Sequence, residues 1–215
     1  MPTHTVHADP TVRTTHTLPA APIVRTTHTS PATPTVRTTH TSPTAPAVRT
    51  VHTVHPSPLG DLLLTGSVSP AGGLTLTSLS LPGQRGAPAV RPEEREDRPF
   101  AGAHRQLDAY FAGRRTRFGL RLSPAGSPFQ QSVWRALDDV PYGTTTTYGE
   151  LAARLGLPRA AIRPVGRALG ANPLLLLRPC HRVVGADGSL RGYAAGADRK
   201  LWLLTHEGAL PPALL

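Results

Sequence analysis

Residues 172–184 read Asn-Pro-Leu-Leu-Leu-Leu-Arg-Pro-Cys-His-Arg-Val-Val and contain the only cysteine of the 215-residue chain. The apolar run at 174–177 predicts a buried strand, and Pro179 predicts a fixed turn that presents Cys180 after it. A cysteine with an ordinary pKa of about 8.5 is mostly a thiol at neutral pH. A nucleophilic role for Cys180 therefore requires a neighbour that removes the proton or stabilises the thiolate.

Two residues next to the cysteine could activate it, namely His181 and Arg182. Neighbouring side chains of an extended segment point to opposite sides, so a contact between His181 and the sulfur needs a tight turn or a bridging water. The competing interpretation is that Cys180 is a small core residue and His181 a hydrogen-bonded core histidine. The stretch by itself leaves both interpretations open.

The single cysteine also limits the classes of protein that fit. It cannot close an internal disulfide, and a structural zinc site needs several Cys or Cys/His ligands at close spacing. We therefore expect no metal and no cofactor, and a reducing compartment, the cytoplasm. The sequence has no run of about 20 apolar residues and begins without the apolar segment of a secretory signal, so we expect neither a membrane partner nor export.

The chain is strongly basic, with 23 Lys and Arg against 13 Asp and Glu and a formal net charge of +10. Lys200 is the only lysine, so nearly all of the positive charge is arginine. Such a balance suits nucleic acid or another polyanion, although charge reports on non-specific association rather than on fold.

Residues 1–55 form a repeat in which VRTTHT starts at residues 12, 24 and 36 and returns as VRTVHT at residue 48. Proline interrupts every copy, and large apolar residues are scarce. Such a segment cannot bury enough apolar surface to offset its ordering entropy, so we predict a disordered N-terminal tail. Its histidines lack a fixed geometry, and we expect no specific metal site there.

An N-terminal support domain is expected over residues 56–125. Residues 59–81 contain short apolar runs and apolar–polar alternations between glycines and a Pro-Gly pair, which predicts a meander of antiparallel strands. A charged linker follows. Leu107, Tyr110 and Phe111 then share one face of a predicted helix that ends at Gly113.

Residues 126–215 are expected to form a C-terminal helical domain, which makes the fold class α+β. Ser127 to Gln130 and Thr147 to Glu150 are capping boxes, and each predicts the start of a helix. A third helix is predicted from about residue 160 to Gly170. The last two helices, joined by a short turn, suggest a helix-turn-helix, with Arg163 in the first turn of the second helix.

The residues around the cysteine and several distant segments resemble the O6-alkylguanine-DNA alkyltransferases, also called methylated-DNA–protein-cysteine methyltransferases. The resemblance runs from Phe129 to Gly208, and a weaker one covers the N-terminal domain, which in this family is a small ribonuclease-H-like sheet. The motifs that carry it are Tyr148-Gly-Glu-Leu-Ala-Ala, Arg163-Pro-Val-Gly, Asn172-Pro, Pro179-Cys-His-Arg-Val-Val, Gly192-Tyr-Ala and Arg199-Lys-Leu-Trp-Leu-Leu-Thr-His-Glu-Gly.

The resemblance implies a single-turnover suicide enzyme that repairs DNA by direct damage reversal. Cys180 would attack the alkyl carbon on O6 of guanine, possibly also on O4 of thymine, and keep the alkyl group as a thioether. His181 would deprotonate the thiol through a water, and Glu207 would orient the imidazole. Asn172 would tie the recognition helix to the active-site loop.

The resemblance also implies a partner, double-stranded DNA that contains O6-alkylguanine, bound by a monomer through the minor groove. The target base must be rotated out of the stack. Arg163 would fill the vacated place, and Tyr148 would donate a hydrogen bond to the rotated base. The backbone of Val183 and the segment Tyr193 and Ala194 would line its pocket.

A second hypothesis is an alkyltransferase-like protein that binds the lesion without transferring the alkyl group. Such proteins have tryptophan at the acceptor position, whereas this chain has Cys180. Two departures from the family pattern lie near the pocket. Arg178 occupies a normally apolar position, and Ala195 stands where many members have glycine.

Overall fold

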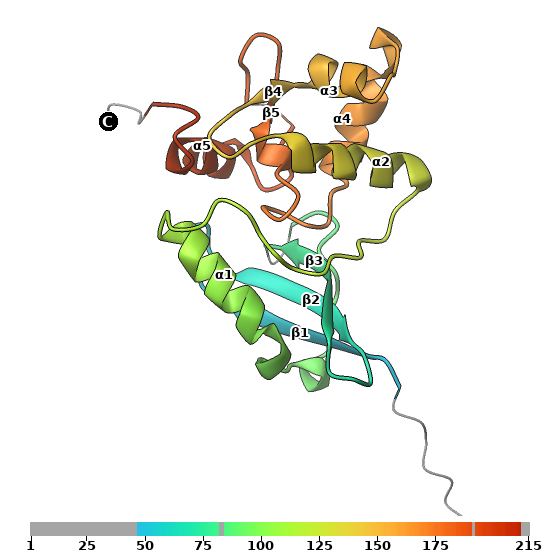
Figure 1. The fold of residues 1–215 in the computed structure, drawn as a ribbon, viewed down its shortest axis with the longest axis vertical. Coiled ribbons are helices and arrows are strands. Elements are labelled where there is room, and N and C mark those ends of the chain that lie inside the picture. Colours follow the sequence, from blue (N-terminus) through green and yellow to red (C-terminus); the bar gives the residue numbers. More distant parts are fainter. Residues whose placement is uncertain (1–46, 82–83, 191, 212–215) are drawn as a thin grey trace, which may run out of the picture. The chain divides into compact units, whose positions relative to one another are not determined.

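A three-stranded antiparallel sheet in the order β1-β2-β3 forms the base of the N-terminal half in a computed structural model, which describes residues 47–81, 84–190 and 192–211. The strands are β1 (Arg49–His55), β2 (Leu62–Val68) and β3 (Leu74–Ser80). Helix α1 (Ala101–Phe111) lies against one face of the sheet (Figure 1). The described residues belong to one unit, Thr44–Leu215.

The start of the sheet corrects the predicted end of the tail. Residues 49–55 are a strand rather than the last part of a disordered segment, and they pair with the whole of β2. In the fourth copy of the repeat, Val51 replaces the threonine of the earlier copies. Its side chain is 2 % exposed and joins the core under α1, which gives this copy the buried apolar contact that a strand needs. Residues 1–46 of the predicted tail lie outside the described residues.

The C-terminal half contains a group of short helices around a parallel pair of two-residue strands, β4 (Thr146–Thr147) and β5 (Val183–Val184). The helices are α2 (Pro128–Ala136), α3 (Tyr148–Arg154), α4 (Ile162–Gly170) and α5 (Ala197–His206). The 3-10 turns of the described chain are η1 (Pro92–Glu94), η2 (Arg98–Phe100), η3 (Leu137–Asp139), η4 (Arg159–Ala161) and η5 (Cys180–Arg182).

Helices α2 and α3 begin where the sequence predicts. Both capping boxes are complete, with the side chains of Ser127 and Thr147 accepting from the backbone three residues on. The third helix starts slightly later than predicted, because residues 159–161 form the turn η4 and α4 begins at Ile162. The three helices pack around a core that includes Val133, Leu151, Val165 and Leu169.

The predicted strand at 174–177 is wrong, and this segment is a tight turn. Leu176 has a φ of 68°, and the Leu177 N–H donates to the Leu175 carbonyl at 2.6 Å, which closes a three-residue turn. All four leucines are buried against the core of the N-terminal sheet, and Leu175 donates to the carbonyl of Leu79 in β3 at 2.9 Å. The run is apolar because it fills the junction between the sheet and the helices.

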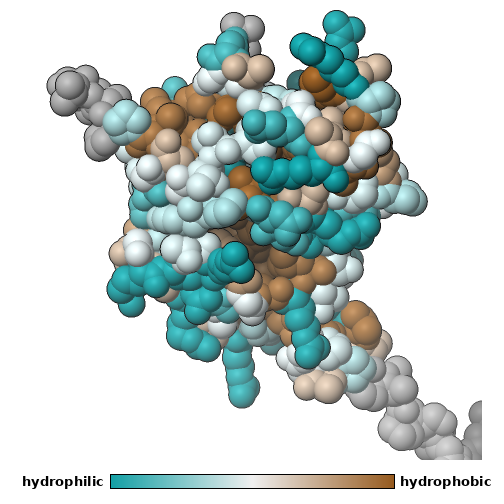
Figure 2. Space-filling view, turned by 45° about the horizontal axis from the view of Figure 1, so that its top comes forward, coloured by the Kyte–Doolittle hydropathy of each residue, from teal (hydrophilic) through white to brown (hydrophobic). Residues whose placement is uncertain are grey.

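The face shown in Figure 2 mixes hydrophilic and hydrophobic residues, with hydrophobic residues exposed near its centre and at its upper left. Among the described residues, no helix is both long enough and apolar enough to cross a membrane.

Candidate active site

The turn that carries Cys180 is set by the proline before it. Pro179 has φ −77° and ψ 62°, and the Cys180 N–H donates to the Arg178 carbonyl at 2.7 Å. These are the angles and the contact of an inverse γ-turn, and the proline ring fixes φ near the value that this turn requires. The chain continues directly into η5, so Cys180 is held in a buried turn and is 8 % exposed.

Asn172 connects the end of α4 to this turn. Its amide nitrogen donates to the Arg178 carbonyl at 2.9 Å and lies 3.2 Å from Cys180 Sγ, and its amide oxygen accepts from the Leu174 N–H at 3.0 Å. Asn172 is 4 % exposed. Because both ends of a buried amide are used, the side chain fixes the cysteine turn relative to α4.

Glu207, the residue that follows α5, brings three donors together at a buried carboxylate. His181 Nε2 donates to Oε1 at 2.8 Å, and Arg182 donates from Nε to Oε2 at 2.8 Å and from Nη2 to Oε1 at 3.0 Å. Tyr110 of α1 donates its hydroxyl proton to Oε1 at 2.7 Å. Since an ionised carboxylate only accepts, His181 carries its proton on Nε2, and the buried Nδ1, which has no partner within the protein, is left as the acceptor.

Burial and hydrogen bonds shift the pKa values of Glu207, His181 and Cys180 and so set which of them is charged at neutral pH. Burial opposes the ionisation of Glu207, but the hydrogen bonds from His181 and Arg182 outweigh it and lower its pKa to about 2. Burial lowers the pKa of His181 against the attraction of Glu207, so the imidazole is neutral at pH 7. Burial also raises the pKa of the Cys180 thiol, opposed by the hydrogen bond from Asn172 and the charge of Lys200. The resting site is a neutral thiol beside a neutral imidazole.

Aromatic rings from two segments surround the cysteine turn. Tyr148 opens α3, and burial together with the nearby Cys180 raises its pKa. Tyr193 packs edge-on to His181, with ring centroids 6.4 Å apart. Gly192 has a φ of 81°, which favours glycine, and a Cβ at this position would lie 2.8 Å from Tyr148 Oη, so a larger residue would require the tyrosine to shift.

The other predicted DNA-contacting residues are placed at differing depths. Val183 is buried in β5, and its carbonyl accepts from Lys200 Nζ at 2.6 Å. Ala194 is half-buried and borders a hollow of about 370 Å³ that it shares with Leu81 of the N-terminal half. Arg163 is exposed in the first turn of α4 and is not part of the Cys180 cluster.

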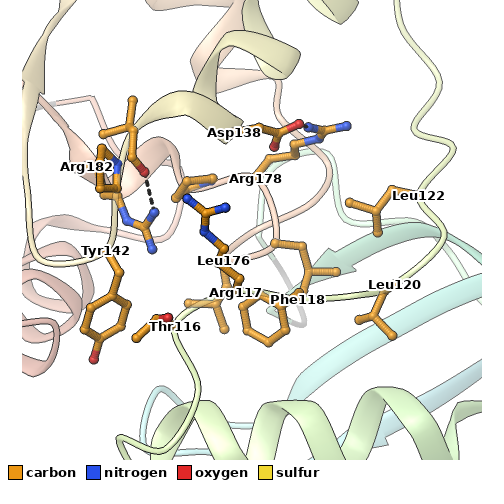
Figure 3. Close-up of a pocket in the computed structure, with 14 residues that line it drawn as sticks. Thr116, Arg117, Phe118, Leu120, Leu122, Asp138, Tyr142, Leu176, Arg178 and Arg182 are labelled. Atoms are coloured by element: carbon orange, nitrogen blue, oxygen red, sulfur yellow. Dashed lines mark hydrogen bonds and ion pairs between the residues drawn. The ribbon is translucent and has the colours of Figure 1, made fainter.

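A separate pocket of about 370 Å³ is lined by residues 176–179 and by Arg182 of η5 (Figure 3). Its walls include Arg178, which forms an ion pair with Asp138, and Arg182, which donates to the Val140 carbonyl at 2.6 Å. Neither Cys180 nor His181 lines this pocket. The ion pair explains how an arginine is accommodated directly before Pro179.

Three contributions to the site were missed or misassigned from the sequence. Arg182 holds Glu207, where the sequence suggested a role beside the thiol. Lys200 is 1 % exposed and close enough to affect the Cys180 thiol, and its being the sole lysine was the one available signal. Tyr110 reads in sequence only as one apolar position of a helix. Within the described ranges, no group of three or more His, Cys, Asp or Glu side chains is arranged to hold a metal ion.

The two halves match the two domains of one family. Residues 50–124 match the 6-O-methylguanine DNA methyltransferase ribonuclease-like domain, and residues 128–209 match the 6-O-methylguanine DNA methyltransferase DNA binding domain.

Relatives and solved structures point to the same family. A methylated-DNA–protein-cysteine methyltransferase of Mycolicibacterium paratuberculosis is 54% identical over 118 residues, which are 55% of this chain and 71% of the relative. One of Methanosarcina acetivorans is 53% identical over 110 residues, 51% of this chain and 70% of the relative. The crystal structure of Mycobacterium tuberculosis OGT in complex with DNA is 43% identical with a TM-score of 0.66, covering 75% of this chain and 95% of that one. The chain therefore belongs to the 6-O-methylguanine DNA methyltransferase family.

Proposed function

We propose that this protein repairs DNA by moving the alkyl group from O6 of an alkylated guanine to Sγ of its own Cys180. The observation that carries the proposal is the buried Cys180, His181 and Glu207 arrangement, in which the carboxylate binds Nε2 and leaves Nδ1 as the acceptor. It supplies a nucleophile, a base and a residue that orients the base.

The transfer is a single displacement. The thiol gives its proton to His181 through a water, Sγ forms a bond to the alkyl carbon, and the bond from that carbon to O6 breaks with its electrons left on guanine. The base then takes up a proton and is restored. The thioether that forms is stable, because its C–S bond is neither hydrolysed nor reduced under ordinary cellular conditions, so each molecule reacts once.

Arg182 keeps the base of this reaction neutral. Its guanidinium places two hydrogen bonds on Glu207 and balances the carboxylate charge. Without that balance, the buried carboxylate would favour a protonated His181, which could not accept the proton of the thiol. The low pKa of Glu207 and the lowered pKa of His181 agree with this division of charge.

DNA is bound in this proposal through α3 and α4, used as a helix-turn-helix, with α4 in the minor groove and the target nucleotide rotated out of the stack. The exposed Arg163 in the first turn of α4 fills the vacated place. Tyr148, the Val183 backbone, Tyr193 and Ala194 then contact the rotated base. The support domain of residues 56–125, extended back to include β1, holds the catalytic domain of residues 126–215, and the protein acts as a cytoplasmic monomer.

A single-turnover assay tests this function. The protein is mixed in excess with a duplex bearing one O6-methylguanine, and repair is followed as restoration of a restriction site that the lesion blocks. With protein in excess we expect every lesion to be repaired. With DNA in excess we expect at most one lesion to be repaired per protein molecule. Cys180→Ala should bind the lesion duplex but leave it unrepaired. Tight lesion binding by the wild-type protein with no repair would instead indicate an alkyltransferase-like lesion-binding protein.

The role of Arg163 needs its own comparison. Arg163→Ala should slow repair of the duplex more than the reaction with free O6-methylguanine, because only the duplex requires base rotation. Arg121→Ala removes an equal charge from an exposed position in the N-terminal half and serves as the matched control. Equal losses on duplex and free base would reject the assignment, and Arg159 and Arg167 would be examined next.

A further inference from the structure

Tyr110 joins the N-terminal half of the protein directly to the site. It lies in α1, 97 residues before Glu207, is fully buried, and donates its hydroxyl proton to Glu207 Oε1 at 2.7 Å. No role in the site was assigned to it from the sequence. The contact connects the support domain to the reacting groups through one hydrogen bond.

The oxygen that Tyr110 binds is the one that orients the histidine. Glu207 Oε1 accepts from Tyr110 Oη, from His181 Nε2 and from Arg182 Nη2, whereas Oε2 accepts from Arg182 Nε. Of these donors, Tyr110 Oη comes from the other half of the chain, and together with the two Arg182 nitrogens it holds the carboxylate against rotation about its terminal bond. The position of the imidazole therefore depends on a hydroxyl from the other half of the chain.

The tyrosine ring is itself held on several sides. The rings of Phe118 and His206 lie 5.3 Å from its centroid, and the Tyr142 ring lies 6.0 Å away. The Tyr110 carbonyl accepts from His206 Nε2 at 2.9 Å, so α1 is also fixed to the end of α5. Burial and the Glu207 charge raise the pKa of Tyr110 strongly, so its hydroxyl stays protonated and always acts as the donor.

We propose that Tyr110 is a positioning residue for the alkyl transfer, which acts from the support domain by fixing the carboxylate that orients His181. This inference rests on the proposed function. Loss of the hydroxyl leaves the Glu207 carboxylate held by Arg182 and His181 alone, so it is constrained less and becomes more basic, since one donor is removed. A more basic Glu207 holds the proton of His181 at higher pH, so the base is lost earlier as the pH falls.

Other charged and titratable groups also face the Glu207 and His181 pair, and the Tyr110 substitution leaves them all in place. They are Arg182 of η5, Lys200 of α5, Cys180, Tyr142 and Tyr193. Any change in the pH profile of a Tyr110 variant is therefore measured against a constant background.

The test compares Tyr110→Phe with Tyr142→Phe in the single-turnover assay across the pH range. Tyr142 lies at the same junction and donates to the His206 carbonyl at 3.2 Å rather than to Glu207. We expect Tyr110→Phe to react about tenfold more slowly near neutral pH, the size of effect expected for a lost hydrogen bond to a charged group. Its acid limb should move to higher pH. Tyr142→Phe should keep the wild-type profile.

A second substitution provides a test that does not require Tyr110→Phe to fold. Replacing Tyr110 by 3-fluorotyrosine keeps the ring and its hydroxyl but makes the hydroxyl a stronger donor. The carboxylate becomes less basic, and the acid limb should move to lower pH. If the wild-type protein is active and the acid limb of the pH–rate profile is unchanged in both variants, the role of Tyr110 is overturned. A wild-type protein that transfers no alkyl group would overturn the proposed function instead.

Discussion

Replacing Glu207 by glutamine preserves the shape of the side chain but removes its charge and one of its two acceptor oxygens. In the wild-type protein, Oε1 accepts from Tyr110, His181 and Arg182, and Oε2 accepts from Arg182 Nε. The amide nitrogen of a glutamine must occupy one of these two places, where it would meet a donor. Arg182 would also lose the charge that balances it.

The cost of this substitution follows from the pKa of the carboxyl. The folded protein lowers the pKa of Glu207 from an ordinary 4.5 to about 2, which at about 1.36 kcal/mol per pH unit corresponds to roughly 3 kcal/mol of stability near neutral pH. Breaking a buried ion pair by removing one partner costs a similar 3–5 kcal/mol or so. Because the pKa is depressed by folding, this stability is present above pH 4.5 and is lost as the pH falls toward 2.

Urea unfolding of the wild type and Glu207→Gln measures the difference directly. We expect the variant to be less stable by roughly 3 kcal/mol near pH 7, and the gap to narrow as the pH is lowered through about 4. Glu93→Gln is the control, since Glu93 is exposed and its nearest cation, Arg91 Nε, lies 3.8 Å away. A gap below about 1 kcal/mol at neutral pH, or one that does not change with pH, would refute the charge assignment at this carboxylate.

Three further predictions concern the site and the helix that borders it. Gly192→Ala should slow alkyl transfer in the single-turnover assay while lesion binding changes less, because the new Cβ would displace Tyr148; an unchanged rate would show that the tyrosine moves freely. Thr147→Ala should lower the free energy of unfolding by about 1 kcal/mol through loss of the α3 cap, as read from urea titrations, and a neutral result would mean that the cap is replaced by another group. The transfer rate should fall as the pH drops below 6.5, because His181 takes up a proton and no longer acts as a base. The free energy of unfolding should fall over the same range, because the histidine of the unfolded chain is protonated first. A transfer rate that rises on acidification would contradict a neutral base.

Local rules predicted the starts of α2 and α3 correctly because the signals lie within four residues of one another. The capping boxes at Ser127 and Thr147 needed no knowledge of the rest of the chain. The strand at 49–55 was not predicted because this segment closely matches the earlier Thr- and Pro-rich copies of the repeat. It differs from them at Val51, and the side chain of Val51 is buried against core residues that come later in the chain.

The part of the site that sequence could not supply is the part that spans the two halves. The role of Tyr110 depends on a contact 97 residues away, and a tyrosine on the apolar face of a helix carries no mark of that contact. The run at 174–177 was taken for a strand because a short apolar stretch looks the same whether it lies in a sheet or fills a junction. The sequence singled out Cys180 and His181 because they are adjacent in a distinctive motif, but it left open how the two side chains are arranged.

The most direct test of the account is where the alkyl group goes. After reaction with a duplex carrying O6-methylguanine, peptide mass mapping should find the mass of one added CH₂ on the peptide that contains Cys180, with every other peptide unchanged. A repaired duplex with an unmodified Cys180 peptide, or a methyl group on any other residue, would contradict the central claim that this buried thiol is the acceptor.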